Sequence, residues 1–153
     1  MGPIELADVV GLDVVMSVGK VFFQSLGVEV PPILKERYDT KRFGKKTGEG
    51  FYLWRDDKAQ KPSAAGQPPA DLQDRLILAL VNECVAVLRE QIVDDADLVD
   101  AGVIFGTGFA PFRGGPIEYA RARGVENVVT RLTELQQRYG ERFAPDAGWQ
   151  LLH

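Results

Sequence analysis

The sequence lacks two residue types on which many functional sites are built. Cys84 is the only cysteine and His153 the only histidine among the 153 residues. A single cysteine excludes a disulfide framework and a cysteine-based zinc site within the chain. A single histidine at the last position excludes a multi-histidine metal site and a Ser-His-Asp triad. We therefore predict that this chain holds no metal.

Neither an excess of positive charge nor a long apolar run is present. The chain has 18 Lys and Arg residues against 22 Asp and Glu residues, a formal net charge of −4. Because nucleic-acid binding depends on Lys and Arg against phosphate, this balance argues against a nucleic-acid partner. No apolar run approaches the roughly 20 residues that a membrane helix needs. The N-terminus has no basic flank or apolar stretch of a secretion signal, so we predict a cytoplasmic protein without a membrane span.

Hydrophobic residues, 45% of the chain, recur mainly with helical spacing. We predict helices over residues 3–10, 13–27, 33–38, 71–91, 96–104, 116–123 and 126–138. Asp94 or Asp95 is expected to cap the helix over 96–104. On the longest helix one apolar stripe is expected to be largely buried: Leu72, Leu76, Leu80, Cys84, Val87 and Leu88. No alternating run is long enough to found a sheet, so the predicted fold class is all-α.

The chain contains an internal repeat with an offset of 113 positions. Residues 2–15 (GPIELADVVGLDVV) and 115–128 (GPIEYARARGVENV) are identical at half of their fourteen positions. The matches include a proline that starts a helix, a glutamate in its first turn and a glycine that ends it. Two predicted helices, 71–91 and 96–104, precede the second copy, and none precedes the first.

This comparison predicts how the chain is organised. Residues 1–54 form a first helical repeat that lacks its N-terminal helices, and residues 70–153 form a complete second repeat. Residues 55–69, rich in charged residues and proline, have the composition of a surface linker. A unit without its front half is what a cut polypeptide looks like, so we interpret the chain as a fragment.

Three segments resemble the C-terminal domain of 3-hydroxyacyl-CoA dehydrogenases: residues 1–13 (MGPIELADVVGLD), 42–52 (RFGKKTGEGFY) and 106–115 (GTGFAPFRGG). Their tandem arrangement resembles the multifunctional enzymes of fatty-acid β-oxidation. The likeness covers nearly the whole chain. It implies two pseudo-repeated all-α units of the 6-phosphogluconate-dehydrogenase C-terminal type. It also implies a parent enzyme that oxidises the 3-hydroxyl of an acyl-CoA with NAD and carries an enoyl-CoA hydratase domain.

The resemblance also implies what this chain does not do. In the family, the catalytic His-Glu pair and the glycine-rich NAD loop lie in a preceding Rossmann domain, so we expect no catalytic residue, no cofactor and no activity here. The family's Asn lies on a helix of the first repeat, and Asp74 stands at the matching place in the second. The implied partners are the acyl-CoA substrate, the Rossmann and hydratase domains and a thiolase subunit. The uncovered first repeat predicts a homo-oligomer.

Five residues are candidates for substrate binding. Phe105 stands where the multifunctional enzymes place an aromatic substrate contact, and Phe109 follows in the same glycine-flanked turn. Lys45 and Lys46 could meet the phosphates of CoA, although the same loop could be a tight turn with both lysines solvated. Arg113 could hold an anion near the next helix start, or it could pair with a carboxylate that locks the turn.

Two rival functions remain open from the sequence. The repeat alone would permit a freestanding helical interaction module with no enzymatic parent. An upstream reading frame that encodes a Rossmann domain would favour the enzyme, whereas a stop codon would favour the module. A second rival is an acyl-CoA-binding domain, which requires measurable affinity without the NAD-binding domain.

Overall fold

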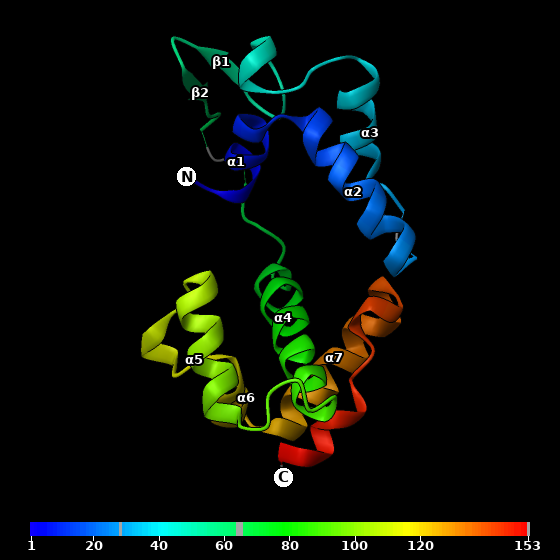
Figure 1. Ribbon diagram of the computed structural model, residues 1–153, viewed down its shortest axis with the longest axis vertical. Helices are drawn as coiled ribbons and strands as arrows, with labels where there is room; N and C mark the ends of the chain where they lie inside the picture. The colour runs from blue at the N-terminus through cyan, green and yellow to red at the C-terminus, as the bar shows by residue number, and fades with distance from the viewer. Residues whose placement is uncertain (28, 64–65, 153) are drawn as a thin grey trace. The chain divides into compact units, whose positions relative to one another are not determined.

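The computed structural model describes residues 1–27, 29–63 and 66–152, so His153 lies outside the described part. The chain divides into two compact units, Met1–Gly66 and Gln67–His153. Their boundary falls inside the stretch 55–69 that the sequence marks as a linker. Each unit has its own hydrophobic core. Figure 1 labels the helices and strands of both units.

The first unit is built from short helices and a hairpin. Its elements are α1 (Pro3–Val10), α2 (Leu12–Leu26), α3 (Pro32–Asp39), the 3₁₀-helix η1 (Lys45–Thr47), β1 (Leu53–Arg55) and β2 (Lys58–Gln60). The antiparallel strands correct the expectation that no sheet forms, and they occupy the start of the predicted linker. Asp56 and Asp57 connect them with φ values of 48° and 63°. Aspartate tolerates this left-handed conformation, which two-residue hairpin turns require.

A buried carboxylate organises the first unit, whose apolar core is small. Leu12, Met16 and Leu34 are its buried hydrophobic residues. The fully buried Asp8 accepts hydrogen bonds from the backbone N–H groups of Phe51 (2.8 Å) and Tyr52 (2.9 Å). The indole N–H of Trp54 donates to the same carboxylate at 3.0 Å. Asp8 therefore joins α1 to the loop that leads into the hairpin.

All regular elements among the described residues of the second unit are helices. Its elements are α4 (Leu72–Arg89), α5 (Ala96–Thr107), η2 (Pro111–Arg113), α6 (Pro116–Arg123), α7 (Val125–Tyr139), η3 (Glu141–Phe143) and η4 (Ala147–Leu152). The carboxylate of Asp95 caps α5 by accepting from the N–H groups of Asp97 (2.7 Å) and Leu98 (3.1 Å). The all-α class is confirmed, apart from the small hairpin of the first unit.

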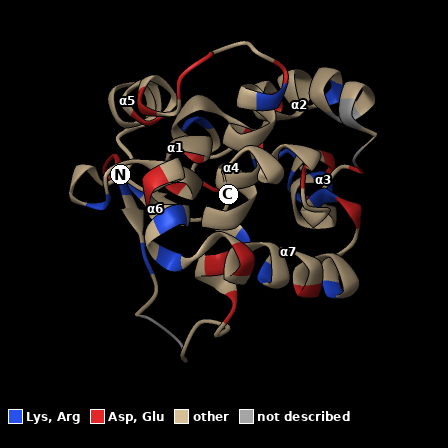
Figure 2. Ribbon diagram, turned by 90° about the horizontal axis from the view of Figure 1, so that it is seen from below, with Lys and Arg blue, Asp and Glu red and all other residues tan. Residues whose placement is uncertain are grey.

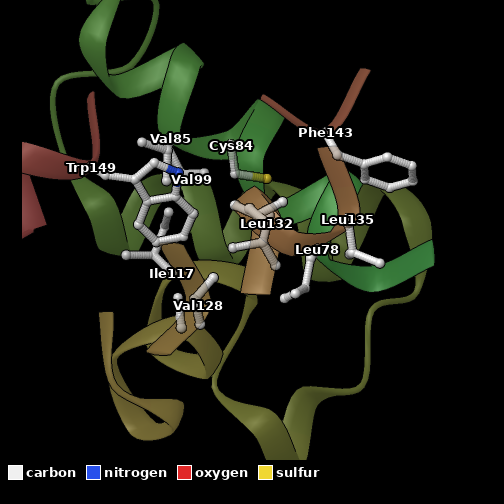
Figure 3. Packing of buried hydrophobic residues seen from close by; sticks show 12 residues of the cluster. Leu78, Cys84, Val85, Val99, Ile117, Val128, Leu132, Leu135, Phe143 and Trp149 are labelled. Atoms are coloured by element: carbon white, nitrogen blue, oxygen red, sulfur yellow. The ribbon is translucent and has the colours of Figure 1, made fainter. Parts of the chain in front are cut away.

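The core of the second unit gathers side chains from α4 to η4. Figure 3 shows the indole of Trp149 and the ring of Phe143 toward opposite ends of this cluster. On α4 the buried residues are Leu78, Val81, Cys84 and Val85. The predicted stripe is therefore partly wrong, since Leu72 is 37% and Leu76 65% exposed. Because α4 is apolar around most of its circumference, periodicity alone could not select the face that its neighbours cover.

The two copies of the repeat differ in what covers them. Ile117 on α6 is fully buried, whereas its counterpart Ile4 on α1 is 46% exposed. A Cβ built on Gly115 would lie 2.3 Å from Asp100 of α5, but nothing lies within 4 Å of a Cβ on Gly2. Helix α5 thus packs closely on the start of α6, and α1 has no such neighbour among the described residues.

Candidate functional site

A pocket of about 460 Å³ lies along α5 in the second unit, lined by residues from Asp97 to Phe105 of this helix. Its lining combines apolar and acidic side chains with the turn that leads to α6. The lining residues are Asp97, Asp100, Ala101, Ile104, Phe105, Pro111, Gly114 and Glu118. One of the predicted substrate contacts, Phe105, therefore lines a cavity.

Glycines fold the chain back from α5 to α6 around this pocket. Gly108 ends α5 with a φ of 75°, and Gly115 precedes α6 with a φ of 104°. The carboxylate of Asp100 then accepts hydrogen bonds from the N–H groups of Ile117 (2.6 Å) and Glu118 (3.0 Å). These N–H groups lie in the first turn of α6, where a helix favours negative charge. Asp100 thereby joins α5 to α6 and forms part of the lining of the pocket.

The two predicted aromatic contacts have different surroundings. Phe105 is 89% exposed and lines the pocket. Phe109 is half-buried and packs edge-on against Tyr119, with ring centroids 6.4 Å apart. Phe105 is thus available to a ligand, whereas Phe109 supports the turn that shapes the cavity.

The electrostatics of the pocket suit an apolar group better than a phosphate. Asp97, Asp100 and Glu118 contribute carboxylates to its wall. Arg113 lies in η2 and is exposed, with its guanidinium carbon 5.5 Å from the centroid of the Phe112 ring. Within the described chain no carboxylate lies within ion-pair distance of Arg113, so the expected pairing that would lock the turn is not found.

The predicted lysine pair lies in the first unit and is not free. Lys46 Nζ lies 2.5 Å from a carboxylate oxygen of Asp13, and Lys45 Nζ lies 3.2 Å from Asp57. The hydrogen bond from Lys46 holds the pKa of Asp13 below its usual range. Both lysines lie in a tight turn, keep 38% and 46% of their side-chain surface exposed, and form surface ion pairs. Any phosphate at this loop would have to displace two surface ion pairs.

Asp74, at the place of the family's Asn, is engaged by two arginines. Arg123 Nη1 donates to one of its oxygens and Arg131 Nε to the other, both at 2.7 Å. These bonds, that from Arg123 first, hold the pKa of Asp74 below its usual range despite partial burial. Acidic and basic residues accordingly share the surface of α6 and α7 (Figure 2). Asp74 is a structural anion that ties α4 to these helices.

Sequence reasoning missed the acidic wall of the pocket. Asp100 could have been recognised from the sequence, because a carboxylate in the apolar helix over 96–107 needs a hydrogen-bonding partner. Among the described residues, no three His, Cys, Asp or Glu side chains are placed to hold a metal ion. Of the described helices, none is both long and apolar enough to span a membrane.

Known proteins are similar in sequence to this chain over nearly its whole length. Residues 1–54 match the family described as 3-hydroxyacyl-CoA dehydrogenase, C-terminal domain. The fatty acid oxidation complex subunit alpha of Vibrio cholerae is 34% identical over 161 residues, which cover 97% of this chain and 23% of that protein. The same subunit of Shewanella halifaxensis is 35% identical, over 96% of this chain and 23% of its own length. The chain thus spans about a quarter of these relatives.

Solved structures share the fold at lower identity. The 3-hydroxybutyryl-CoA dehydrogenase of Escherichia coli K12 matches 99% of this chain and 50% of its own, with a TM-score of 0.69 and 18% identity. The dehydrogenase part of multifunctional enzyme 1 from C. elegans matches 100% of this chain and 39% of its own, at a TM-score of 0.61 and 18% identity. The fold is therefore that of a helical dehydrogenase domain. With the sequence matches, the chain belongs to the 3-hydroxyacyl-CoA dehydrogenase C-terminal domain family.

Proposed function

We propose that this chain is the substrate-side and dimerisation domain of an NAD-dependent 3-hydroxyacyl-CoA dehydrogenase of fatty-acid β-oxidation, and that it is inactive alone. The names of its relatives and the partial span of their length support this assignment. The described residues contain no strand followed by a glycine-rich turn and helix, the arrangement that binds NAD. NAD and the acid-base groups are therefore assigned to a Rossmann domain of the parent enzyme, beside a hydratase domain and a thiolase subunit.

The pocket beside Phe105 carries the proposal. Its exposed aromatic ring offers contact to the carbon chain of an acyl-CoA, and its carboxylates disfavour the phosphates. The acyl group therefore lies against α5, while the nucleotide end of CoA points away from this wall. Arg113 remains a proposed phosphate contact in the second unit. Lys45 and Lys46 remain proposed phosphate contacts of the first unit by itself, at the cost of their ion pairs.

Nuclear magnetic resonance of the labelled chain, titrated with acetoacetyl-CoA, tests this assignment. We expect amide shifts that saturate at Ile104, Phe105 and Glu118, and an affinity about tenfold weaker in Phe105→Ala, because apolar contact worth about 1 to 2 kcal/mol is lost. Phe112→Ala is the matched control, since Phe112 is 84% exposed in η2 of the same unit but does not line the pocket. Equal losses in both variants, or shifts confined to other surfaces, would reject Phe105 as a substrate contact.

The proposed dimerisation role rests on one surface of the first unit, the α1–α2 face. Exposed Val14, Val18 and Val21 share one side of α2, and exposed Val10 lies at the end of α1. At the equivalent positions of the second repeat, 113 residues later, the four valines are replaced by Arg123, Asn127, Arg131 and Glu134. In the second unit Arg123 and Arg131 bind Asp74, so α4 covers these positions there. The valines are explained by a partner, which we assign to a second copy of the chain.

Light scattering after size-exclusion chromatography tests the face. Val14→Asn with Val18→Arg installs the residues of the second repeat, so we expect the dimer to become a monomer with an unchanged circular dichroism spectrum. Ile33→Lys is the control, because Ile33 is 55% exposed on α3 and lies outside the face. A monomeric parent chain, or a variant that stays dimeric, would contradict the role.

A further inference from the structure

A second, smaller pocket of about 180 Å³ lies on the second unit where α4 meets η3. Its lining joins two arginines to an apolar floor. The lining residues are Leu72, Arg75, Leu76, Ala79, Arg142 and Phe143. It shares no residue with the pocket beside Phe105, so it is independent of the proposed function.

Both guanidinium groups are held by aromatic rings. The guanidinium carbon of Arg75 lies 4.3 Å from the centroid of the Tyr139 ring, and that of Arg142 lies 4.8 Å from the centroid of Phe143. These two rings pack edge-on with centroids 6.1 Å apart. A guanidinium that stacks on a ring keeps the N–H donors along its edge free. The adjoining rings therefore present two sets of donors to one small cavity.

Neither of the two guanidinium groups is engaged in an ion pair with a described residue. In the described part of the chain, no carboxylate lies within ion-pair distance of Arg75 or Arg142. The neighbouring Asp71 is nearly buried and already accepts from Tyr139 Oη at 2.6 Å, with Arg138 at 3.3 Å. Glu141 accepts instead from Gln136 at 2.9 Å. Asp71 offsets part of the charge of Arg75 without pairing with it. One pocket with two guanidinium groups that form no ion pair in the described chain still favours an anion.

The rest of the lining selects the kind of anion. Leu72 and Leu76 are 37% and 65% exposed, although the sequence predicts them to be buried. With Ala79 and the ring of Phe143 they form an apolar surface directly beside the guanidinium groups. A volume of about 180 Å³ is below the range of about 300 to 1,000 Å³ typical of drug-sized ligands, so a CoA nucleotide does not fit. A compact head with a short apolar tail matches both parts of the lining.

We propose that this pocket binds the carboxylate of a short-chain alkyl acid, with Arg75 and Arg142 on the carboxylate and Leu72 and Leu76 against the alkyl chain. Charge-assisted hydrogen bonds to guanidinium give the carboxylate its orientation. The alkyl contacts distinguish this ligand from a bare inorganic anion. The site would let the domain sense free acids of the chemical type released by acyl-thioester hydrolysis.

Titration of the labelled 153-residue chain with hexanoate tests the proposal. We expect saturable shifts at Ala79 and Phe143 with a dissociation constant on the order of 1 mM. Arg142→Gln should weaken binding at least about tenfold, because a charge-assisted hydrogen bond is lost. Arg75→Gln should do the same in a chain whose circular dichroism spectrum shows that it is folded. Arg55→Gln is the matched control, because Arg55 is an exposed arginine of β1 in the other unit.

Two further probes decide between ligand classes. Hexanol and inorganic phosphate should each bind at least about tenfold more weakly than hexanoate, because each lacks one half of the recognised chemistry. Phosphate that binds as well as hexanoate would overturn the alkyl-acid assignment, and hexanol that binds as well would overturn the role of the arginines. Absence of saturation, or unchanged binding in Arg142→Gln, would also overturn the site. Phe105→Ala should leave hexanoate binding unchanged, which separates this site from the proposed acyl pocket.

Discussion

Replacement of Asp100 by alanine should destabilise the second unit more than any loss of an exposed helix cap. The Asp100 side chain is 5% exposed, and its two oxygens accept from the N–H groups of Ile117 and Glu118. Because Ile117 is fully buried, water cannot replace the lost acceptor at its N–H group. The change also removes a negative charge from the positive end of α6.

The magnitude follows from the hydrogen bonds. Hydrogen bonds to a charged group contribute about 1.5 to 3 kcal/mol, and loss of an ordinary N-cap costs about 1 kcal/mol. For Asp100→Ala we therefore expect a loss of about 3 kcal/mol. Asp95→Ala is the matched control, because Asp95 also accepts from two backbone N–H groups but is exposed. There we expect a loss of about 1 kcal/mol.

Urea unfolding followed by tryptophan fluorescence measures both variants. Trp149 is 3% exposed in the second unit, and a Trp54→Phe background makes it the single reporter. The unfolding free energies of the variants are compared in that background at pH 7, with one common slope of free energy against urea concentration. Should Asp100→Ala cost no more than Asp95→Ala, the argument that Asp100 fixes α5 on α6 and shapes the pocket is refuted.

Three further predictions concern other buried groups. The pKa of Asp74 is lowered in the folded chain, so the stability that this carboxylate contributes is present above about pH 4 and is lost as pH falls. The difference in unfolding free energy between the parent and Asp74→Asn should therefore shrink between about pH 5 and pH 2. Burial, with the field of Asp100 second, raises the pKa of the Cys84 thiol to about 11. The stability that the protonated thiol of Cys84 contributes should be lost as pH rises from about 9 to 11. Ellman's reagent at pH 8 should react with Cys84 only after unfolding. Gly50→Ala places a Cβ 2.3 Å from the Asp8 carboxylate and should disrupt the first unit. In Gly48→Ala the new Cβ meets nothing within 4 Å, so we expect only a loss of about 1 kcal/mol in unfolding free energy, which comes from the positive φ at this position. Trp54 fluorescence measures the unfolding of both variants.

Periodicity and capping residues predicted where the helices lie, because those signals are local. The proline and glycine of residues 2–15 and of residues 115–128 mark both ends of α1 and α6 within a residue. The buried face of α4 was predicted only in part: Cys84 is buried as expected, but the choice between Leu76 and Leu78 depends on helices that follow later in the chain. The hairpin was missed because its strands have three residues each and its turn uses two aspartates instead of glycine.

The candidate site was only partly predictable for the same reason. Phe105 follows from a local motif, and the structure lines a pocket with it. The carboxylates of Asp97, Asp100 and Glu118 meet there only because α5 folds back on α6. Arg75 and Arg142 are 67 positions apart, and no sequence pattern connects them. Long-range packing therefore created the features that the sequence could not indicate.

One measurement tests the division of labour most directly. The purified chain is titrated with NADH by calorimetry, and oxidation of a 3-hydroxyacyl-CoA by NAD is assayed in the same sample. A substrate-side domain should bind no NADH and show no turnover, because the groups that hold the nicotinamide and move the proton belong to another domain. NAD-dependent turnover by this chain alone would contradict the account.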